Sequence, residues 1–340
     1  MGEDAQVAAI GEVVTSGVSL MERAQGLLER LDGWLPVDAT WLALCDPESN
    51  SYATVGSTGL DRSIVDYLDR PAVAQEIQLT EIGQNRPPVS VAELPVAVDE
   101  LPTWAECLIP AGFREGLGVP LFEHGGPYLG MLSLLFSSEQ PPSAALRDRL
   151  THLAPLIARG VSPMRSLLAS ARLVQGATAG CILHRDGTAY PLPGLEDHSL
   201  LVADSPVVTI AREALSAGLV YQSFMWPTHD GPGLTDHVRI TVLVAADVPP
   251  FLVGTVLLTP HVRCRGLTSR ELEVLGLLVD GRSNQQIATW LSVAPRTVAA
   301  HMEHLLVKME APTRTLAAVR AAREGCYVPP SASLDEPERR

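Results

Sequence analysis

The chain has 340 residues, of which 46% are hydrophobic and 19% are charged, a composition that excludes a globally disordered protein. A single hydrophobic core seldom grows beyond about 250–300 residues, so the length predicts two or three domains. The net charge of −14 excludes a protein that is basic over its whole surface. The acidity is uneven, because residues 265–325 carry 8 basic and 6 acidic side chains (net +2), whereas residues 1–264 carry a net −15.

The spacing of the cysteines indicates whether the chain binds a metal, and the hydropathy pattern indicates where in the cell it is located. The five cysteines lie far apart and form no CxxC pair of the kind that zinc sites use. We therefore expect reduced thiols, no metal and no cofactor. The N-terminus lacks the basic and apolar regions of a signal peptide, and no apolar run reaches the length of about 18 residues that a membrane span needs. A cytoplasmic protein without membrane contact is expected.

Residues 5–160 predict a first α+β domain. Apolar residues recur at helical spacing near its start and near its end, and β-prone runs bounded by turn residues lie between them. The predicted elements are a helix over 6–35, two strands over 38–60, a helix over 63–77, an irregular proline-rich segment over 84–100, two strands over 112–136 and a helix over 143–160.

This order of elements resembles a GAF domain. The phrases that carry the resemblance are LALCDPESNSYATVGSTGL, PVSVAELP, GFREGLGVPLF and YLGMLSLLFSS. The resemblance implies either a small-molecule or redox sensor or a dimerising module without a ligand. A ligand pocket would lie between the sheet and the helical middle, and its candidate residues are Trp41, Trp104, Cys107 and Phe113. The alternative is that these side chains belong to the core.

A redox role is a second interpretation of the first domain. Cys45 and Cys107 could act as redox sensors, or as a thiol pair in an enzyme that resembles free-methionine sulfoxide reductase. The sequence contains no P-loop, GxSxG, HExxH or HRD-like catalytic loop, and the region lacks the acidic pocket of a phosphoacceptor receiver domain. We therefore expect a protein that is not an enzyme.

Residues 163–260 predict a second α+β domain. A helix over 164–174 precedes a hairpin that turns at Asp186 and Gly187, and a helix over 207–217 follows. Three strand candidates, LVYQSFMWP, HVRITVLVAAD and FLVGTVLLTP, complete the region. Two strands, a helical middle and three strands is a PAS-like order, which we use as an analogy only.

Residues 265–325 predict four short helices. Thr268 and Glu271 form a capping box for the first, and Ser283 can cap the second. The helices are predicted over 269–279, after Ser283, from Pro295 and over 313–324. Residues 327–340, rich in Pro, Ser and Glu, are expected to form a disordered tail.

The four-helix region resembles the LuxR-type helix-turn-helix. The matching phrases are LTSRELEVL, GRSNQQIA, TVAAH, KM and RTLAAV, at conventional spacing over about 60 residues. The resemblance implies an all-α head that binds DNA through its third helix. It also implies that the last helix, with Leu316 and Val319, packs against its mate in a dimer.

The third helix has two faces. Val298, Met302, Leu305 and Met309 fall on one apolar stripe that must face the core, since successive residues turn by about 100°. The expected DNA-binding residues on and beside the other face are Arg296, Thr297, Ala299, Ala300, Glu303 and His304, with Asn284 and Lys308 as phosphate contacts. An arginine can pair with guanine, a glutamate can accept a hydrogen bond from cytosine, and alanine methyls can pack on thymine.

Three residues of the head depart from the LuxR-type pattern. Ala294 stands where the family usually has a capping serine, a loss worth about 1 kcal/mol. Ala299 and Glu303 stand where members often carry basic residues. One head is therefore expected to bind DNA weakly, so that dimerisation matters.

The sequence thus predicts a multidomain one-component transcription regulator. Its parts are a GAF-like α+β domain that senses an unknown signal, a PAS-like α+β domain and a LuxR-type head. The expected partners are double-stranded promoter DNA with an inverted repeat, a second copy of the chain, RNA polymerase and a small-molecule ligand. The alternative is a GAF-based redox sensor or enzyme with a vestigial helix-turn-helix.

Overall fold

A computed structural model describes residues 3–47, 49–84, 87–123, 126–228, 236–260 and 264–333. The chain divides into two compact units. The first unit contains Met1–Arg165 and Asp247–Phe251, and the second contains Ser166–Ala246 and Leu252–Arg340. In the described part of the chain, no helix is both long enough and apolar enough to cross a membrane.

The first unit is built on an antiparallel sheet with the strand order β2-β1-β5-β4-β3. Its strands are β1 (Ala39–Cys45), β2 (Tyr52–Thr58), β3 (Val89–Ser90), β4 (Glu115–Phe122) and β5 (Tyr128–Phe136). Side chains of β1 alternate between the two faces, so Leu42 and Leu44 join one apolar cluster and Trp41 and Ala43 join another. The α+β architecture expected for this region is confirmed.

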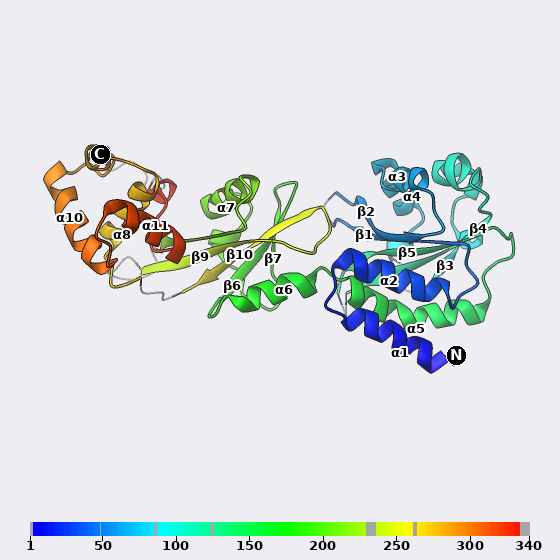
Figure 1. Cartoon of the computed structure of the whole chain (residues 1–340). Helices are drawn as coiled ribbons and strands as arrows, with labels where there is room; N and C mark the ends of the chain where they lie inside the picture. Colours follow the sequence, from blue (N-terminus) through cyan, green and yellow to red (C-terminus); the bar gives the residue numbers. More distant parts are fainter. Residues whose placement is uncertain are drawn as a thin grey trace. The chain divides into compact units, whose positions relative to one another are not determined.

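Helices cover both faces of this sheet (Figure 1). The helices are α1 (Glu3–Thr15), α2 (Leu20–Asp32) and α5 (Ala144–Val161) on one face, and α3 (Arg62–Leu68) and α4 (Pro71–Leu79) on the other. Two predicted helices are each divided in the structure. Ser19 begins α2 with a capping box, which ends the first predicted helix early. Pro71 occupies the first turn of α4 and separates it from α3.

The second unit contains a sheet of the same order, β7-β6-β10-β9-β8. Its elements are α6 (Met164–Leu173), β6 (Ala179–His184), β7 (Ala189–Pro191), α7 (Pro206–Ser216), β8 (Tyr221–Thr228), β9 (Asp236–Val244) and β10 (Leu252–Thr259). Val207, Val208 and Ala211 of α7 are fully buried in the same cluster as Phe224 and Ile240 of the sheet. The predicted order of elements is therefore present, and β8 forms one edge of the sheet.

The four-helix head belongs to the second unit. Its helices are α8 (Ser269–Val279), α9 (Asn284–Trp290), α10 (Pro295–Lys308) and α11 (Arg314–Glu324). Thr268 and Ser283 form the capping boxes that begin α8 and α9, as the sequence predicts. Gly325 ends α11 in the left-handed conformation with φ of 65°, which a residue without a side chain adopts at low cost.

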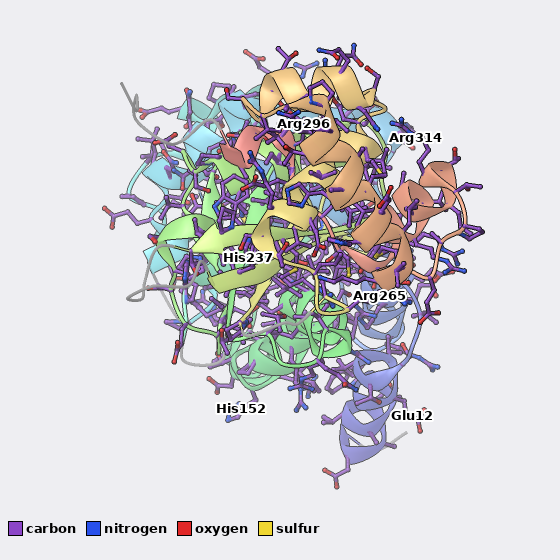
Figure 2. All side chains as sticks on the ribbon, turned by 90° about the vertical axis from the view of Figure 1, so that its left-hand side faces the viewer. Glu12, His152, His237, Arg265, Arg296 and Arg314 are labelled. Carbon is purple, nitrogen blue, oxygen red and sulfur yellow. The ribbon has the colours of Figure 1, made fainter. Side chains whose placement is uncertain are left out.

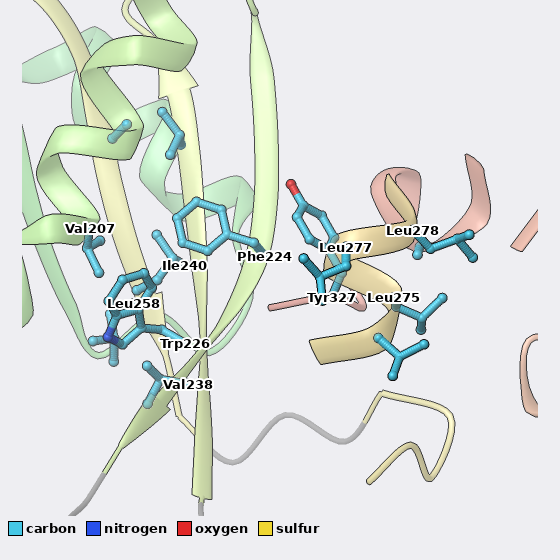
Figure 3. Packing of buried hydrophobic residues seen from close by; sticks show 14 of the residues in the cluster. Val207, Phe224, Trp226, Val238, Ile240, Leu258, Leu275, Leu277, Leu278 and Tyr327 are labelled. Atoms are coloured by element: carbon cyan, nitrogen blue, oxygen red, sulfur yellow. The ribbon is translucent and has the colours of Figure 1, made fainter. Parts of the chain in front are cut away.

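Residues 325–328, which we call the bridging segment, join the head to β8. The Met225 N–H donates to the Tyr327 carbonyl (2.8 Å), and the Val328 N–H donates to the Leu272 carbonyl of α8 (3.1 Å). The Tyr327 ring lies 6.5 Å from the Phe224 ring and beside α8 (Figure 3). One apolar cluster thus continues from the sheet into the head.

The bridging segment corrects the expectation of a tail that is disordered from residue 327. Tyr327 and Val328 are 6% and 3% exposed, and a 3-10 helix follows over Pro330–Ser333. The prediction counted the prolines and serines as signs of disorder, but an aromatic and a β-branched side chain precede them and find an apolar cluster to enter. Residues 334–340 lie outside the described residues.

Candidate nucleic-acid interface

Helix α10 is fixed in the head by one buried stripe. Val298, Met302 and Leu305 are buried within the helix, and Met309 is buried where the helix ends. These are the four residues that helical spacing places on one face. Because the stripe is locked into the core, the opposite face must point away from it.

The opposite face of α10 is open to solvent. Its exposed residues are Arg296, Ala299, Ala300, Glu303, His304 and Val307. Thr297 is half-buried at the edge of this face. The structure therefore places the first six expected residues of α10 on or beside one accessible surface, which we call the reading face. Val307, 77% exposed, adds an apolar side chain to its C-terminal end.

Arg296 and Arg323 have no hydrogen-bond or ion-pair partner among the described residues, whereas other basic residues of the head do. Arg265 is held by Glu324, with 2.6 Å between Nε and Oε2. Arg270 pairs with Glu273 at 2.7 Å. Arg320 donates to the carbonyls of the residues that follow α10. Figure 2 shows Arg296 and Arg265 at separate places on the head. Arg296 is thus a cation that remains available to a ligand.

Lys308 does not have the free ammonium group that a phosphate contact requires. Its Nζ lies 2.7 Å from Oε2 of Glu271 and donates to the Gly266 carbonyl at 2.9 Å. Glu271 is only 3% exposed, and a buried carboxylate needs a cation or several donors. Lys308 therefore joins α10 to α8 inside the head, in contrast to its expected role.

The Glu271 carboxylate is the centre of this internal network. Thr268 donates to it from both its backbone N–H (2.7 Å) and its hydroxyl (3.0 Å). Burial raises the pKa of Glu271, but the Lys308 ammonium and the Thr268 donors outweigh burial, so the pKa lies below its usual value. The carboxylate is accordingly charged at neutral pH.

Asn284 is half-buried at the start of α9 and has one side of its amide occupied. Arg314 donates from Nη1 to Asn284 Oδ1 at 3.4 Å and from Nη2 to the Arg282 carbonyl at 2.6 Å. An amide whose oxygen accepts from arginine has its nitrogen left to donate. Asn284 therefore keeps the donor that a phosphate contact would use.

The beginning of α10 lacks a side-chain cap. Ala294 occupies the N-cap position and supplies no hydrogen bond, whereas the caps of α8, α9 and α11 each accept one. Pro295 occupies the first turn, where its missing N–H leaves no donor unpaired. The helix that carries the reading face is thus the least well capped of the four.

The first unit contains a separate cavity between the sheet and α3, α4 and the segment Thr103–Leu108. It encloses about 90 Å³, whereas a single water needs about 10–15 Å³. Its walls are mostly apolar, and both Trp41 and Trp104 line it. The Trp41 indole N–H is already bound to the Thr54 hydroxyl at 2.7 Å.

Thr103 is the one residue in this wall with an unused buried hydroxyl among the described residues. The side chain is only 6% exposed, and its Oγ1 has no hydrogen-bond partner, while its backbone N–H donates to Glu76 Oε2 at 2.9 Å. A buried hydroxyl without a partner costs about 1–3 kcal/mol. The wall of the cavity therefore contains one buried hydroxyl whose hydrogen-bonding capacity is unused among the described residues. Sequence reasoning missed Thr103, because nothing in the local pattern marks an unpaired hydroxyl.

The other two expected ligand residues do not line this cavity. Phe113 is 8% exposed and joins a core cluster next to it, together with Trp104. Cys107 is half-buried, and burial raises its pKa. Burial also raises the pKa of Cys45 to about 11. Neither thiol has the lowered pKa of a redox-active cysteine, which leaves the redox interpretation of this unit without support.

Comparison with known proteins finds a family that the head resembles. Residues 265–321 match the family model described as bacterial regulatory proteins, luxR family. The transcriptional regulatory protein LiaR of Bacillus subtilis (strain 168) is 41% identical over 64 residues, which are 19% of this chain and 29% of LiaR. The transcriptional regulatory protein DegU of Brevibacillus brevis is 42% identical over 59 residues, which are 17% of this chain and 25% of DegU.

These matches confirm the LuxR-type resemblance for the head. The chain spans less than a third of the length of either relative. Among solved structures, the GAF domain of a phosphoenolpyruvate-protein phosphotransferase from Coxiella burnetii covers 49% of this chain and 95% of its own, with 20% identity and a TM-score of 0.37. A TM-score of this size does not establish a shared fold.

Proposed function

We propose that the chain is a DNA-binding transcription regulator that reads promoter DNA with helix α10. The observation that carries the proposal is the reading face: a solvent-exposed helix surface with an unpartnered arginine, backed by a buried stripe, in a segment that matches the luxR family. A helix of this kind fits the major groove of DNA. Such a role would place the protein in the cytoplasm, in contact with RNA polymerase.

We infer a DNA contact for each kind of side chain on the reading face. Arg296 pairs with guanine or holds a phosphate, and Glu303 accepts from the amino group of cytosine. The methyl groups of Ala299 and Ala300 pack against thymine. Asn284 donates to a phosphate from its free amide nitrogen. Lys308 is left out of the contact set, because its ammonium group is held by Glu271.

Two heads together should bind DNA more tightly than a single head. The head carries a net +2, and most of its cations are held by carboxylates or carbonyls of the same chain. Affinity for DNA depends largely on the number of phosphates that are neutralised. On α11, Leu316 is half-buried and Val319 is 48% exposed, which leaves apolar surface for a second copy. We therefore propose a homodimer on an inverted repeat.

DNA selected from a random-sequence pool by the full chain tests the proposal. The selected sequences should form an inverted repeat, and Arg296→Ala should lower affinity by about 10- to 100-fold, in line with about 1–3 kcal/mol for one specific contact. Because Arg296 has no intramolecular partner, the variant should unfold at the same temperature as the parent chain.

Arg323→Ala is the matched control. It removes one exposed arginine from α11, away from the reading face, and should change affinity less than threefold. If Arg296 reads a base, its loss should relax preference at one position. If it holds a phosphate, binding to every sequence should weaken equally. Failure of the pool to converge, or equal effects of the two variants, would refute the proposal.

We propose in addition that the cavity of the first unit senses the signal, and that the protein is not an enzyme. The apolar walls and the single unpaired Thr103 hydroxyl fit a small, largely apolar molecule with one polar group. Mass spectrometry of small molecules that are released from the purified full chain should identify a species of this class. A chain that releases none and binds none of a panel of such compounds would contradict the sensor role.

A further inference from the structure

Two cysteines that are distant in the sequence meet where the chain enters and leaves the head. Cys264 precedes α8, and Cys326 follows α11 within the bridging segment. They are 5% and 3% exposed and belong to one small cluster with Met225, Leu272 and Val328. The Cys264 thiol lies 4.0 Å from the carbonyl oxygen of Gly325, the residue before Cys326, and the Cys326 thiol donates to the Glu324 carbonyl at 3.8 Å. The two thiols therefore share one small buried cluster at the two ends of the head.

A cation lies beside one of the two thiols. Arg239 of β9 donates from Nη2 to Cys264 Sγ at 3.4 Å. The Cys326 hydrogen bond and then the Arg239 guanidinium lower the pKa of Cys264 to about 7, although burial opposes them. The same contact raises the pKa of Cys326, which therefore keeps its proton.

The remaining cysteines lie in a different environment. Burial raises the pKa of Cys45 to about 11, of Cys181 to about 12 and of Cys107 above its usual value. A thiol in apolar surroundings is a poor nucleophile, because the thiolate is the reactive form. Among the five thiols, Cys264 is the one set up to react first.

We propose that Cys264 and Cys326 are an oxidation site, at which a hydroperoxide converts the two thiols into a disulfide that closes the head. The Cys264 thiolate attacks one oxygen of hydrogen peroxide, the O–O bond breaks, and the departing hydroxide takes a proton and leaves as water. Cys264 is then a sulfenic acid. The Cys326 sulfur attacks the Cys264 sulfur and releases its proton, the S–O bond breaks, and a second water leaves. Two thiols lose two electrons, and one peroxide becomes two waters.

The disulfide would act on the connection between the head and the sheet. Cys326 is flanked by Gly325, whose left-handed backbone lies against Ser223, and by Tyr327, whose carbonyl accepts from Met225 on β8. A bond from Cys326 to Cys264 would tether this segment to the start of the head. Oxidation is therefore expected to fix the bridging segment, which is hydrogen-bonded to β8, at the start of the head, and reduction to permit its movement.

Hydrogen peroxide is the probe for the chemical step. The full chain with Cys45→Ser, Cys107→Ser and Cys181→Ala should lose two free thiols, and its mass should fall by about 2 Da, the two hydrogens released. A peptide map should show Cys264 joined to Cys326. With Cys326→Ser in addition, dimedone should label a sulfenic acid on Cys264. Oxidation of Cys45 or Cys107 before Cys264 in the parent chain, or bonds between chains only, would overturn the proposal.

Variants of Arg239 test whether this arginine activates Cys264 or only supports the structure. Arg239→Gln should slow oxidation at pH 7 by about fivefold to tenfold, since fewer Cys264 thiols would be ionised, and the rate should recover at higher pH. Arg239→Lys, which keeps the charge, should restore most of the rate. Rates that are equal in all three chains would contradict the activation of Cys264 by this arginine.

Hydrogen exchange tests the effect on the junction. Backbone amides of Met225 and Val328 donate the two hydrogen bonds that hold the bridging segment. Their exchange should be at least tenfold slower in the peroxide-treated chain than in the reduced chain, and peroxide should have no effect on them in the Cys326→Ala variant. Equal exchange in the oxidised and reduced chains would show that the disulfide does not fix the bridging segment, and would overturn the proposed effect of oxidation.

Discussion

The two sheets of the molecule have the same strand order but serve different purposes. In the first unit, the face that carries Trp41 borders a cavity and leaves the Thr103 hydroxyl without a partner. In the second unit, α7 fills one face of the sheet, and the edge strand β8 receives the bridging segment of the head. One topology can therefore border a cavity or anchor another domain, and the difference lies in the segments that cover it.

The largest expected effect comes from a variant that breaks the anchoring role of the second sheet. A Cβ at Gly276 of α8 would lie 1.7 Å from the Val328 carbonyl oxygen, so Gly276→Ala must displace the bridging segment. We expect the free energy of unfolding of the second unit to fall by about 3 kcal/mol, the upper part of the range for overpacked sites. Urea unfolding with hydrogen exchange at Val328 measures both changes.

Gly11→Ala is the control for that experiment. It makes the same change within α1, where a Cβ meets no atom within 4 Å. It should stabilise the first unit by about 0.5–1 kcal/mol, because alanine favours the helix. A Gly276→Ala chain as stable as its parent would mean that the bridging segment is not held against α8.

The next largest effect concerns the stability of the head, and not that of the sheet to which the head is anchored. Glu271→Gln removes the charge that holds Lys308, and should destabilise the head by about 2 kcal/mol at pH 7. Because the folded-state pKa of Glu271 is lowered, its contribution is complete above the unfolded-state pKa of about 4.3 and is lost as pH falls through the lower, folded-state value.

A pH series of unfolding experiments checks the sign of this effect. The parent chain should lose the Glu271 contribution on acidification, and the Glu271→Gln chain should show a correspondingly smaller loss. Glu303→Gln is the control, since Glu303 is exposed on the reading face. If the parent and Glu271→Gln lose stability in parallel below pH 5, the Lys308 ion pair is not the source.

A smaller effect, with the opposite sign, sharpens the role of the first sheet. Thr103→Val keeps the shape of the side chain but removes the unpaired hydroxyl, and should raise the free energy of unfolding of the empty first unit by about 1 kcal/mol. The same variant should weaken binding of a ligand that uses the hydroxyl by about fivefold or more. Calorimetry measures both quantities. A Thr103→Val chain that is less stable when empty would indicate that the hydroxyl has a partner in solution.

The smallest effect leaves both sheets untouched. Ala294→Ser supplies the missing cap of α10 and should stabilise the head by about 0.5–1 kcal/mol. Thermal unfolding of the second unit measures it, and the ligand response of the first unit should not change. Ala300→Ser, in the middle of the exposed face of α10, is the comparison, since it should stabilise nothing.

The sequence was most informative where structural signals are local. The first three helices of the head begin at local signals: the Thr268–Glu271 capping box, Ser283 and Pro295. Helix α8 has the bounds that its capping box predicts. The buried stripe of α10 was equally predictable from the sequence, since helical geometry alone determines it. In the first unit, by contrast, two predicted helices proved to be four, because Ser19 and Pro71 interrupt continuous apolar patterns.

The features that depend on tertiary contacts were not predictable in the same way. Lys308 was expected to reach phosphate, because the partner that holds it, Glu271, lies on another helix. Of the four expected cavity residues, two line the cavity, and the sequence does not distinguish a wall from a core for apolar side chains. Cys264 and Cys326 lack any spacing motif, since folding alone brings them together.

The ion pair of Arg265 with Glu324 has a consequence for the way the head joins the rest of the chain. It places the entrance and the exit of the head side by side, so the four helices begin and end at one place. The luxR-family match stops at residue 321, before the bridging segment that is hydrogen-bonded to β8. The proposed contact with DNA therefore belongs to the matched residues. The contacts of the head with β8 begin within α11 and continue into the bridging segment, beyond the matched residues.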